Sequence, residues 1–441
     1  MTSSVAWPAP TASHPLNATV VVPGSKSLTN RYLILAAIAD GKSTLRLPLR
    51  SRDSVLMVQA LEALGVKVTG FDADRDTDQW ELTPPEGALK APAHIDCGLA
   101  GTVMRFVPLI AAFADGPVTL DGDERARERP MGPIITALRD LGVQVDDDGR
   151  NALPITVQGT GEVAGGEISV DASGSSQFVS AVLLAAPKFT NGVTVRHVGD
   201  VLPSVPHIDM TVENLRDQGV EVDVEYREVD GKNSPVAWTV QPGPVTPLDL
   251  TVEPDLSNAG PFLAAPAVAG GSVTVPRWPS RTTQGGDKMR ELLTAMGAEA
   301  TLDERGLTIT GSGVLHGIDA DLHEVGELAP TIAAVATLAS SPSRLRGIAH
   351  LRGHETDRLA ALVTEIERLG GKARELDDGV EIFPVENLHG AAMESYEDHR
   401  MATFAAILGL NVPGVSIINV ETTAKTMPDF KQMWTDMINA Q

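Results

Sequence analysis

The strongest constraint on the fold of this chain is a local pattern that returns five times at a nearly constant interval. Each copy consists of the end of an amphipathic helix, a glycine, and residues of alternating polarity, as in LEALGVKV and LRDLGVQV. Glycine after a helix favours a left-handed cap, and a period of two predicts a strand. The glycines of the five copies are Gly65, Gly142, Gly219, Gly297 and Gly370. A period of about 75 residues predicts a fold made of equivalent units.

A second, more apolar helix recurs out of phase with the first. It is hydrophobic on nearly every side, which predicts burial inside a domain, whereas the amphipathic helices should cover the outside. Its copies start near Ser27, Thr102, Ser175, Ser257, Glu327 and His399. Six units, each with two helices and several short strands, divide most simply into two similar halves of three units.

We therefore predict an α/β chain with two similar domains. The proline-rich segment from Pro242 to Pro247 marks the break between them. The first domain is expected to cover residues 25–244, and the second residues 1–24 together with 245–441. The extreme N-terminal strand should pair with the second half, because a chain that crosses between twin domains often leaves its start behind.

Composition limits the possible partners. Hydrophobic residues make up 42% of the chain, which is enough for a large core. The net charge of −23 disfavours nucleic acid and anionic membranes, so an anionic substrate requires the basic residues to gather in one cleft. The single cysteine, Cys97, permits neither an internal disulfide nor a cysteine metal cage. Without a signal-peptide pattern or a long apolar run, we expect a soluble cytoplasmic protein.

The starts of the apolar helices carry polar residues that a structural helix does not need. A helix N-terminus attracts anions, so six such ends pointing into one gap would form an anion site in an acidic protein. For each serine taken alone, an ordinary helix cap is the alternative. The residues singled out at these starts are Ser25, Lys26, Ser27, Arg31, Arg105, Ser175, Ser176, Gln177, Asp255, Ser257, Asn258, Glu324, Glu327, Asp398, His399 and Arg400, together with the glycine Gly101.

Other basic residues fall in segments expected to be loops. The run ERARERP, which ends with Arg129 and Pro130, would ordinarily be a solvated face. Glu355 and Arg358 have the spacing of a helical surface ion pair, which is the modest alternative to a functional role. Lys425 precedes a final amphipathic helix.

Six of these segments, PGSKSLTNR, GLAGTVMR, RERP, SSQF, HETDRL and DHRMA, resemble in this order the 5-enolpyruvylshikimate-3-phosphate (EPSP) synthase family. The resemblance spans essentially the whole chain. It implies two domains of three βαβαββ-type repeats each, an inverse α/β barrel-like fold, with the active site in the cleft between them. The implied reaction transfers the enolpyruvyl group of phosphoenolpyruvate to the 5-hydroxyl of shikimate 3-phosphate through a tetrahedral intermediate and needs no metal or organic cofactor. Because the sequence shows no obvious extra hydrophobic module, we expect a monomer.

The resemblance also implies roles for individual residues. Glu327 is the expected base, and Glu355 and Lys26 are the expected proton donor and shuttle. Glyphosate is expected to compete with phosphoenolpyruvate. The implied contacts of shikimate 3-phosphate are Lys26, Ser27, Arg31, Ser175, Ser176, Gln177, Ser204, Glu327 and His354. Those of phosphoenolpyruvate are Lys26, Gly101, Arg129, Gln177, Arg358, Arg400 and Lys425.

The chain departs from the family pattern at four positions. Many members have Asn, Asp, Lys and Tyr where this chain has Leu99, Glu327, His354 and His207. Glu327 keeps a carboxylate on a longer side chain, His354 is fully charged only below its pKa, and Leu99 lacks a side-chain amide.

Three other functions compete with this interpretation. UDP-N-acetylglucosamine enolpyruvyl transferases share the fold but usually carry a catalytic loop cysteine, whereas Cys97 is expected to be a small buried residue. A P-loop is rejected because Ser25, not glycine, precedes Lys26. A repeat scaffold without activity explains the period but not the cations at the helix starts.

Overall fold

In a computed structural model, which describes residues 6–75, 77–199, 202–229, 232–353 and 355–440, the chain divides into two compact units. The N-terminal unit is Gly24–Val252, and the C-terminal unit is Glu253–Gln441 together with Met1–Pro23. The division follows Val252 rather than Pro244, so the expected boundary lay too early. The physical reason is that strand β14 (Asp249–Thr251) pairs in parallel with β3 (Ser43–Arg46) of the N-terminal unit.

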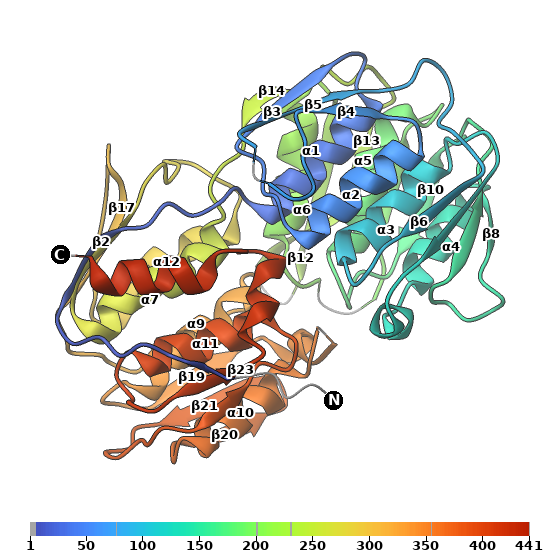
Figure 1. Cartoon of the computed structure of the whole chain (residues 1–441). Coiled ribbons are helices and arrows are strands. Elements are labelled where there is room, and N and C mark those ends of the chain that lie inside the picture. The colour runs from blue at the N-terminus through green and yellow to red at the C-terminus, as the bar shows by residue number, and fades with distance from the viewer. Residues whose placement is uncertain (1–5, 76, 200–201, 230–231, 354, 441) are drawn as a thin grey trace. The chain divides into compact units, whose positions relative to one another are not determined.

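The six apolar helices form where the sequence predicts them. Within the N-terminal unit α1, α3 and α5 contact one another, and within the C-terminal unit α7, α9 and α11 do the same (Figure 1). Each helix is buried along nearly its whole length, as its apolar composition requires. Their bounds are α1 (Lys26–Ile38), α3 (Gly101–Ala111), α5 (Gln177–Ala185), α7 (Leu256–Ala269), α9 (Ala329–Thr337) and α11 (His399–Gly409).

The amphipathic helices bury one face and end as predicted. The five repeat glycines follow them with φ between 80° and 107°, the left-handed conformation that glycine adopts without strain. These helices are α2 (Arg52–Ala63), α4 (Gly132–Asp140), α6 (Pro206–Asp217), α8 (Met289–Ala295) and α10 (Arg358–Arg368), and α12 (Phe430–Asn439) closes the chain. Short 3₁₀ helices are η1 (Glu124–Glu128), η2 (Ala186–Lys188), η3 (Gly285–Lys288), η4 (Gly326–Leu328), η5 (Ala349–Gly353) and η6 (Val420–Lys425).

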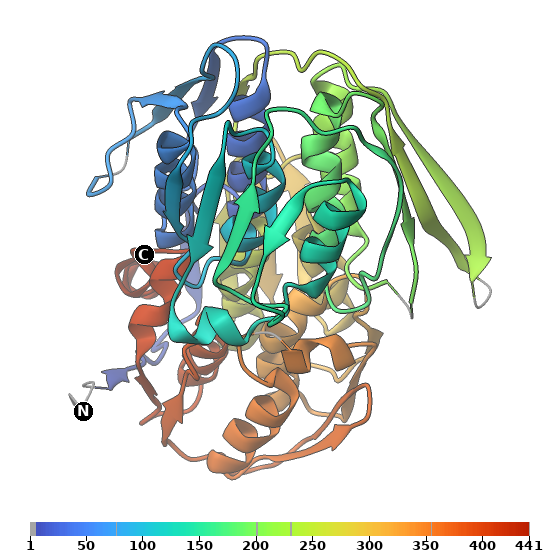
Figure 2. The same cartoon turned by 90° about the vertical axis from the view of Figure 1, so that its right-hand side faces the viewer.

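The three sheets of the N-terminal unit share one strand pattern, in which the first two strands are parallel and the next two pairings are antiparallel. The first has the order β14, β3, β5 (Gln79–Thr83), β4 (Lys67–Thr69). The second is β6 (Ala93–Asp96), β7 (Pro117–Asp121), β9 (Ile155–Gln158), β8 (Gln144–Asp146). The third is β10 (Gly166–Val170), β11 (Val193–His197), β13 (Lys232–Val240), β12 (Val222–Val229), and its long β12–β13 hairpin is prominent in Figure 2.

The C-terminal unit repeats this pattern with strands taken from both ends of the chain. One sheet is β2 (Leu16–Thr19), β15 (Gly271–Val275), β17 (Gly306–Gly311), β16 (Glu299–Asp303). Another is β18 (Asp319–Asp321), β19 (Ser343–Arg346), β21 (Gly379–Phe383), β20 (Lys372–Leu376). The third has three strands, β22 (Ala392–Glu394), β23 (Ser416–Ile418) and β1 (Trp7–Pro8). The N-terminal segment therefore pairs with the second half, which confirms that prediction.

Each unit has its own hydrophobic core between its helices and sheets. Trp80 and Trp238 are fully buried in the core of the N-terminal unit, and Trp434 in that of the C-terminal unit. Burying one large apolar side chain stabilises the folded state by about 1.5–3 kcal/mol, so each core can hold its helix starts in place. Among the described residues, every helix is too short or too polar to cross a membrane.

Candidate active site

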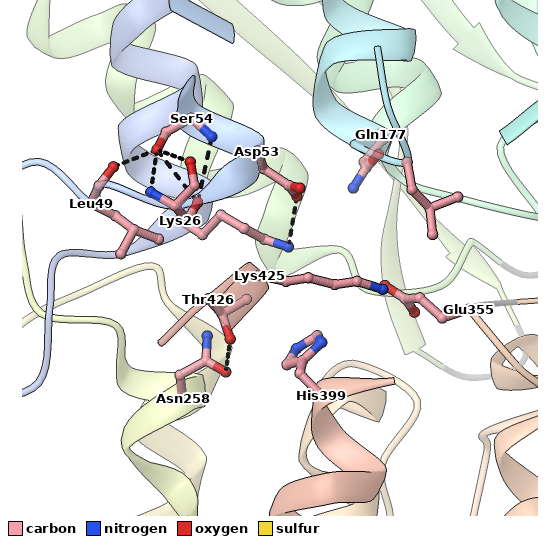
Figure 3. Close-up of polar contacts among 12 residues, drawn as sticks. Lys26, Leu49, Asp53, Ser54, Gln177, Asn258, Glu355, His399, Lys425 and Thr426 are labelled. Atoms are coloured by element: carbon pink, nitrogen blue, oxygen red, sulfur yellow. Dashed lines mark hydrogen bonds and ion pairs between the residues drawn. The ribbon is translucent and has the colours of Figure 1, made fainter. Parts of the chain in front are cut away.

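The first predicted cluster lies at the start of α1. Ser25 caps the helix by accepting a hydrogen bond from the N–H of Leu28 at 3.4 Å, so Ser27 is not the cap. The Lys26 ammonium donates a hydrogen bond to Oδ2 of Asp53 at 3.3 Å (Figure 3). The side chains of Lys26 and Asp53 are 23% and 12% exposed, so this ion pair is only partly screened by solvent.

Arg31, one turn further along α1, is buried and linked to two other helices. Its guanidinium donates to the Ser27 carbonyl at 3.1 Å and to the His207 carbonyl at 2.9 Å. It also donates to the hydroxyls of Thr211 at 2.8 Å and Ser180 at 3.3 Å. Burial lowers the pKa of Arg31 to about 10. Because these contacts occupy most of its donors, Arg31 chiefly joins α1, α5 and α6.

Gly101, the first residue of α3, leaves room for two neighbouring side chains. A Cβ at this position would lie 3.1 Å from Nη2 of Arg129 and 3.4 Å from Oε1 of Gln177. Nη1 of Arg129 donates to the main-chain carbonyl of Leu99 at 3.1 Å. Position 99 therefore holds the arginine through its backbone, which the leucine side chain does not change. The buried Nε of Arg129 has no hydrogen-bond partner among the described residues.

The other arginines of ERARERP behave as a solvated face. Arg125 pairs with Glu128, and Arg127 donates two hydrogen bonds to Asp121 at 2.9 and 2.7 Å. All four side chains are well exposed, so these ion pairs contribute little to stability. Only Arg129 of this run faces Gly101.

At the start of α5, Arg105 holds the predicted residues Ser175 and Gln177 in place. Nη1 of Arg105 donates to Oγ of Ser175 at 3.1 Å and to Oε1 of Gln177 at 2.8 Å. Ser176 precedes the helix and is buried. Ser204 has a left-handed backbone (φ 54°), and its carbonyl accepts the N–H of His207 at 3.0 Å.

In the C-terminal unit, Arg358 is the centre of a buried charge cluster. Its Nε donates to Oδ2 of Asp398 at 2.7 Å, and its Nη2 donates to Oε2 of Glu355 at 3.1 Å. Burial alone would lower the pKa of Arg358, but the charges of Asp398, Glu355 and Glu327 raise it above its usual value. Arg358 is 2% exposed and Glu355 precedes α10, so the helical surface pair considered from the sequence is wrong.

Arg400 lies in the first turn of α11 beside this cluster. Its main-chain N–H donates to Oδ1 of Asp398 at 2.8 Å, which caps the helix. Burial and the neighbouring positive charge of Arg358 lower the pKa of Arg400, although Glu327, Asp255 and Asp398 act in the opposite direction. Within the part of the chain that the structure describes, the Arg400 guanidinium makes no hydrogen bond or ion pair.

Glu327 lies in η4, just before α9, and its carboxylate is held from two sides. Ser257 donates a hydrogen bond to its Oε1 at 3.2 Å. A Cβ at Gly285 would lie 3.1 Å from the same oxygen, so glycine there leaves room for the longer glutamate side chain. Ser257 is not the cap of α7, because Asp255 accepts the N–H of Asn258 at 2.9 Å.

Lys425 ends η6, and a hydrogen bond anchors the next residue. The hydroxyl of Thr426 donates to Oδ1 of Asn258 at 3.2 Å (Figure 3). The Lys425 ammonium donates to the carbonyl of Glu397 at 2.7 Å. Glu397 has a left-handed backbone and directly precedes Asp398. His354, predicted to contact shikimate 3-phosphate, lies outside the described residues.

Within each unit, the structure brings predicted residues together and adds partners that sequence reasoning missed. Asp53 carried no signal, since an acid at the start of an amphipathic helix is usual, and Gly285 lies in an ordinary loop sequence. Cys97 is fully buried, and burial raises its pKa to about 12. This confirms the interpretation of Cys97 as a small core residue and argues against a thiolate nucleophile.

Comparisons with known proteins agree along the whole chain. The family profile described as "EPSP synthase (3-phosphoshikimate 1-carboxyvinyltransferase)" matches residues 10–434. A 3-phosphoshikimate 1-carboxyvinyltransferase of Kocuria rhizophila is 55% identical over 99% of this chain and 97% of its own length. Two structures of EPSP synthase from Acinetobacter baumannii share the fold, with TM-scores of 0.80 and 0.78 at 24% and 23% identity. The first covers 98% of this chain and 97% of its own, and the second 97% of each.

His350 packs against Gly326, next to Glu327, and its burial favours the neutral imidazole. Its Nε2 lies against the backbone of Gly326, where a Cβ would approach to 2.7 Å. Burial lowers the pKa of His350 to about 4, with smaller contributions from His323 and Arg358 in the same direction and from Glu327 against it.

We predict that replacing His350 by Phe weakens the acid sensitivity of folding. As pH falls below about 6.5, the unfolded chain takes up a proton that folded His350 refuses until about pH 4, so wild-type stability decreases over that window. The expected loss between pH 7 and pH 5 is about 1–2 kcal/mol, and the variant should lack it. Urea unfolding of both proteins at the two pH values measures this, and an equal loss in both would contradict it.

Proposed function

Because the chain belongs to the EPSP synthase family, we propose that the residues described above divide between the two substrates of that family's reaction. The protein transfers the enolpyruvyl group of phosphoenolpyruvate to the 5-hydroxyl of shikimate 3-phosphate and releases inorganic phosphate. This reaction belongs to the shikimate pathway, which leads to chorismate and the aromatic amino acids.

The observation that carries the proposal is the pair of arginines at α10 and α11. Arg358 is satisfied by Asp398 and Glu355, whereas the guanidinium of Arg400 has no acceptor among the described residues. Burial, and after it the positive charge of Arg358, lower the pKa of Arg400, and a bound anion would oppose both effects. A guanidinium binds carboxylate or phosphate oxygens in a fork, so we assign phosphoenolpyruvate to Arg400, Arg358 and Lys425.

In the N-terminal unit, Arg129, Gln177 and Lys26 are assigned to the same substrate. Gly101 supports this assignment, because a Cβ there would lie within 3.4 Å of both Arg129 and Gln177. Phosphoenolpyruvate is small, and a methyl group there would compete with it for volume.

Shikimate 3-phosphate is assigned to hydroxyl, amide and cationic side chains of the N-terminal unit. These groups lie at the starts of α1 and α5 and before α6, where helix N-termini favour a phosphate. They are Lys26, Ser27, Arg31, Ser175, Ser176, Gln177 and Ser204, and we add Glu327 and His354 of the C-terminal unit. We propose that the protein acts as a cytoplasmic monomer.

The chemistry assigns a proton to each step. Glu327 accepts the proton of the 5-hydroxyl as its oxygen bonds to C2 of phosphoenolpyruvate, and a proton is added to the methylene carbon. The resulting tetrahedral intermediate loses phosphate and one methyl proton, which restores the double bond. Glu355 and Lys26 are the proposed donor and shuttle. The arginines stabilise charge on the departing phosphate.

The reaction is tested by phosphate release from phosphoenolpyruvate with either shikimate 3-phosphate or UDP-N-acetylglucosamine as acceptor. Release with the first acceptor alone is expected. Release with the second would favour the sister transferase. No release and no thermal shift with either substrate pair would favour a scaffold.

We predict that Lys26→Ala lowers kcat/KM by a factor that corresponds to a loss of about 3–4 kcal/mol of transition-state stabilisation. This loss is typical when a group that stabilises transition-state charge is removed. Lys67→Ala, which removes an exposed lysine of the same unit, is the matched control and should keep wild-type kinetics. Steady-state rates with both substrates varied measure the effect. A Lys26→Ala enzyme with most of its activity would exclude this lysine from the mechanism.

We predict that Gly101→Ala raises the KM for phosphoenolpyruvate more than that for shikimate 3-phosphate and weakens competitive inhibition by glyphosate, by roughly tenfold. The added methyl would lie 3.1 Å from Nη2 of Arg129 and force it to move. Gly132→Ala is the control, since its Cβ meets nothing closer than 3.7 Å. Glyphosate inhibition that ignores phosphoenolpyruvate concentration would contradict the shared site.

We predict that saturating shikimate 3-phosphate slows hydrogen exchange at the segments that carry its proposed contacts. Protection is expected at the starts of α1 and α5 and in η4. Mass spectrometry of peptides from each unit measures it. Protection of α1 and α5 without any protection of η4 would remove Glu327 from the proposed contacts of shikimate 3-phosphate.

A further inference from the structure

Arg105 touches two proposed substrate-binding side chains from behind. It lies in the first turns of α3, is only 6% exposed, and its guanidinium lies 4.9 Å from the centre of the Phe178 ring. One of its nitrogens, Nη1, reaches both Oγ of Ser175 and Oε1 of Gln177. Arg105 therefore links α3 to the start of α5.

These contacts fix which atom of Gln177 is available. A guanidinium only donates hydrogen bonds, so it must face the amide oxygen and not the amide nitrogen of Gln177. The 2.8 Å contact with Oε1 is a short, charge-assisted hydrogen bond. Nε2, which carries two N–H donors, is left as the group that Gln177 can offer to a ligand.

The same count applies to Ser175. A hydroxyl can accept two hydrogen bonds and donate one. Oγ of Ser175 accepts from Arg105 at 3.1 Å and from the main-chain N–H of Gln177 at 3.3 Å, which uses both acceptor positions. Its O–H can then only donate.

We propose that Arg105 is a positioning residue that turns Ser175 and Gln177 into donor-only groups, so that this part of the site accepts an anion and rejects a ligand that must donate. The inference rests on the proposed function, in which these residues contact the phosphate and ring of shikimate 3-phosphate. Ser175 and Gln177, although neutral, thereby offer a ligand only hydrogen-bond donors, as an anion requires. Phosphate oxygens satisfy such donors, whereas a neutral hydroxyl in their place satisfies them less well.

The test compares Arg105→Lys, which keeps the charge but not the planar fork, with Arg105→Met, which loses both. Both variants should raise the KM for shikimate 3-phosphate, Arg105→Met by roughly tenfold or more. The preference for shikimate 3-phosphate over unphosphorylated shikimate, as a ratio of kcat/KM, should fall in the same order. Arg196→Met, which removes an exposed, ion-paired arginine of the same unit, is the control and should match wild type.

A double-mutant cycle separates positioning from a direct charge effect. If Arg105 acts through its two neighbours, Arg105→Lys should change the KM less than about threefold in a Ser175→Ala, Gln177→Ala background. Effects that multiply independently would show that Arg105 attracts the substrate by charge alone and would overturn the proposal. So would wild-type kinetics in Arg105→Lys and an unchanged substrate ratio.

Two controls keep the outcomes distinct. Thermal unfolding of each variant establishes that it folds, and if Arg105→Met does not, Arg105→Lys with the cycle still decides. If the wild-type enzyme released no phosphate with shikimate 3-phosphate, the proposed function would fail. If the wild-type enzyme released phosphate but the effects of the Arg105 substitutions were independent of Ser175 and Gln177, only the positioning role of Arg105 would be excluded.

Discussion

The site depends on how the fold holds arginine side chains where water is scarce. A buried guanidinium is stable only when its donors meet carbonyls, hydroxyls or carboxylates, and removing one partner of a buried ion pair costs about 3–5 kcal/mol. Arg31 meets two carbonyls and two hydroxyls, and Arg358 meets Asp398 and Glu355. The contacts of Arg31 with Ser180, Thr211 and His207, and that of Arg358 with Asp398, join segments that are distant in the sequence. The groups that keep these cations buried therefore also fix the polar helix starts.

The buried arginines differ in how many of their hydrogen-bond donors meet an acceptor within the protein, and we infer their roles from this difference. Arg358 is occupied by Asp398 and Glu355, whereas the Arg400 guanidinium meets no acceptor among the described residues, and we propose that its donors bind the substrate. Arg105 uses part of its fork to polarise Ser175 and Gln177. An acidic protein can therefore bind two phosphorylated substrates with few basic residues, because some cations structure the site and others face it.

The carboxylate of Glu327 is also positioned by neighbouring residues. Ser257 does not cap its own helix but donates to Oε1 of Glu327, and Asp255 serves as the cap instead. Gly285 leaves the space that the longer side chain needs. The neighbouring elements therefore define where the carboxylate lies, even though its side chain is one methylene longer than that of aspartate.

The sequence alone determined the six-unit architecture, both sets of helices and the glycine caps, because periodicity and capping are local properties that each repeat encodes by itself. Six short motifs also indicated the family through their resemblance to its members. It also marked most polar helix starts. Only the tertiary structure decided that β14 belongs to the N-terminal unit, that Asp53 meets Lys26, that Arg31 is largely consumed inside its unit, and that Glu355 and Arg358 form a buried rather than a surface pair. Most of those outcomes depend on which donors and acceptors meet across tens to hundreds of residues, and no local pattern records whether a charge is buried or which partner it meets.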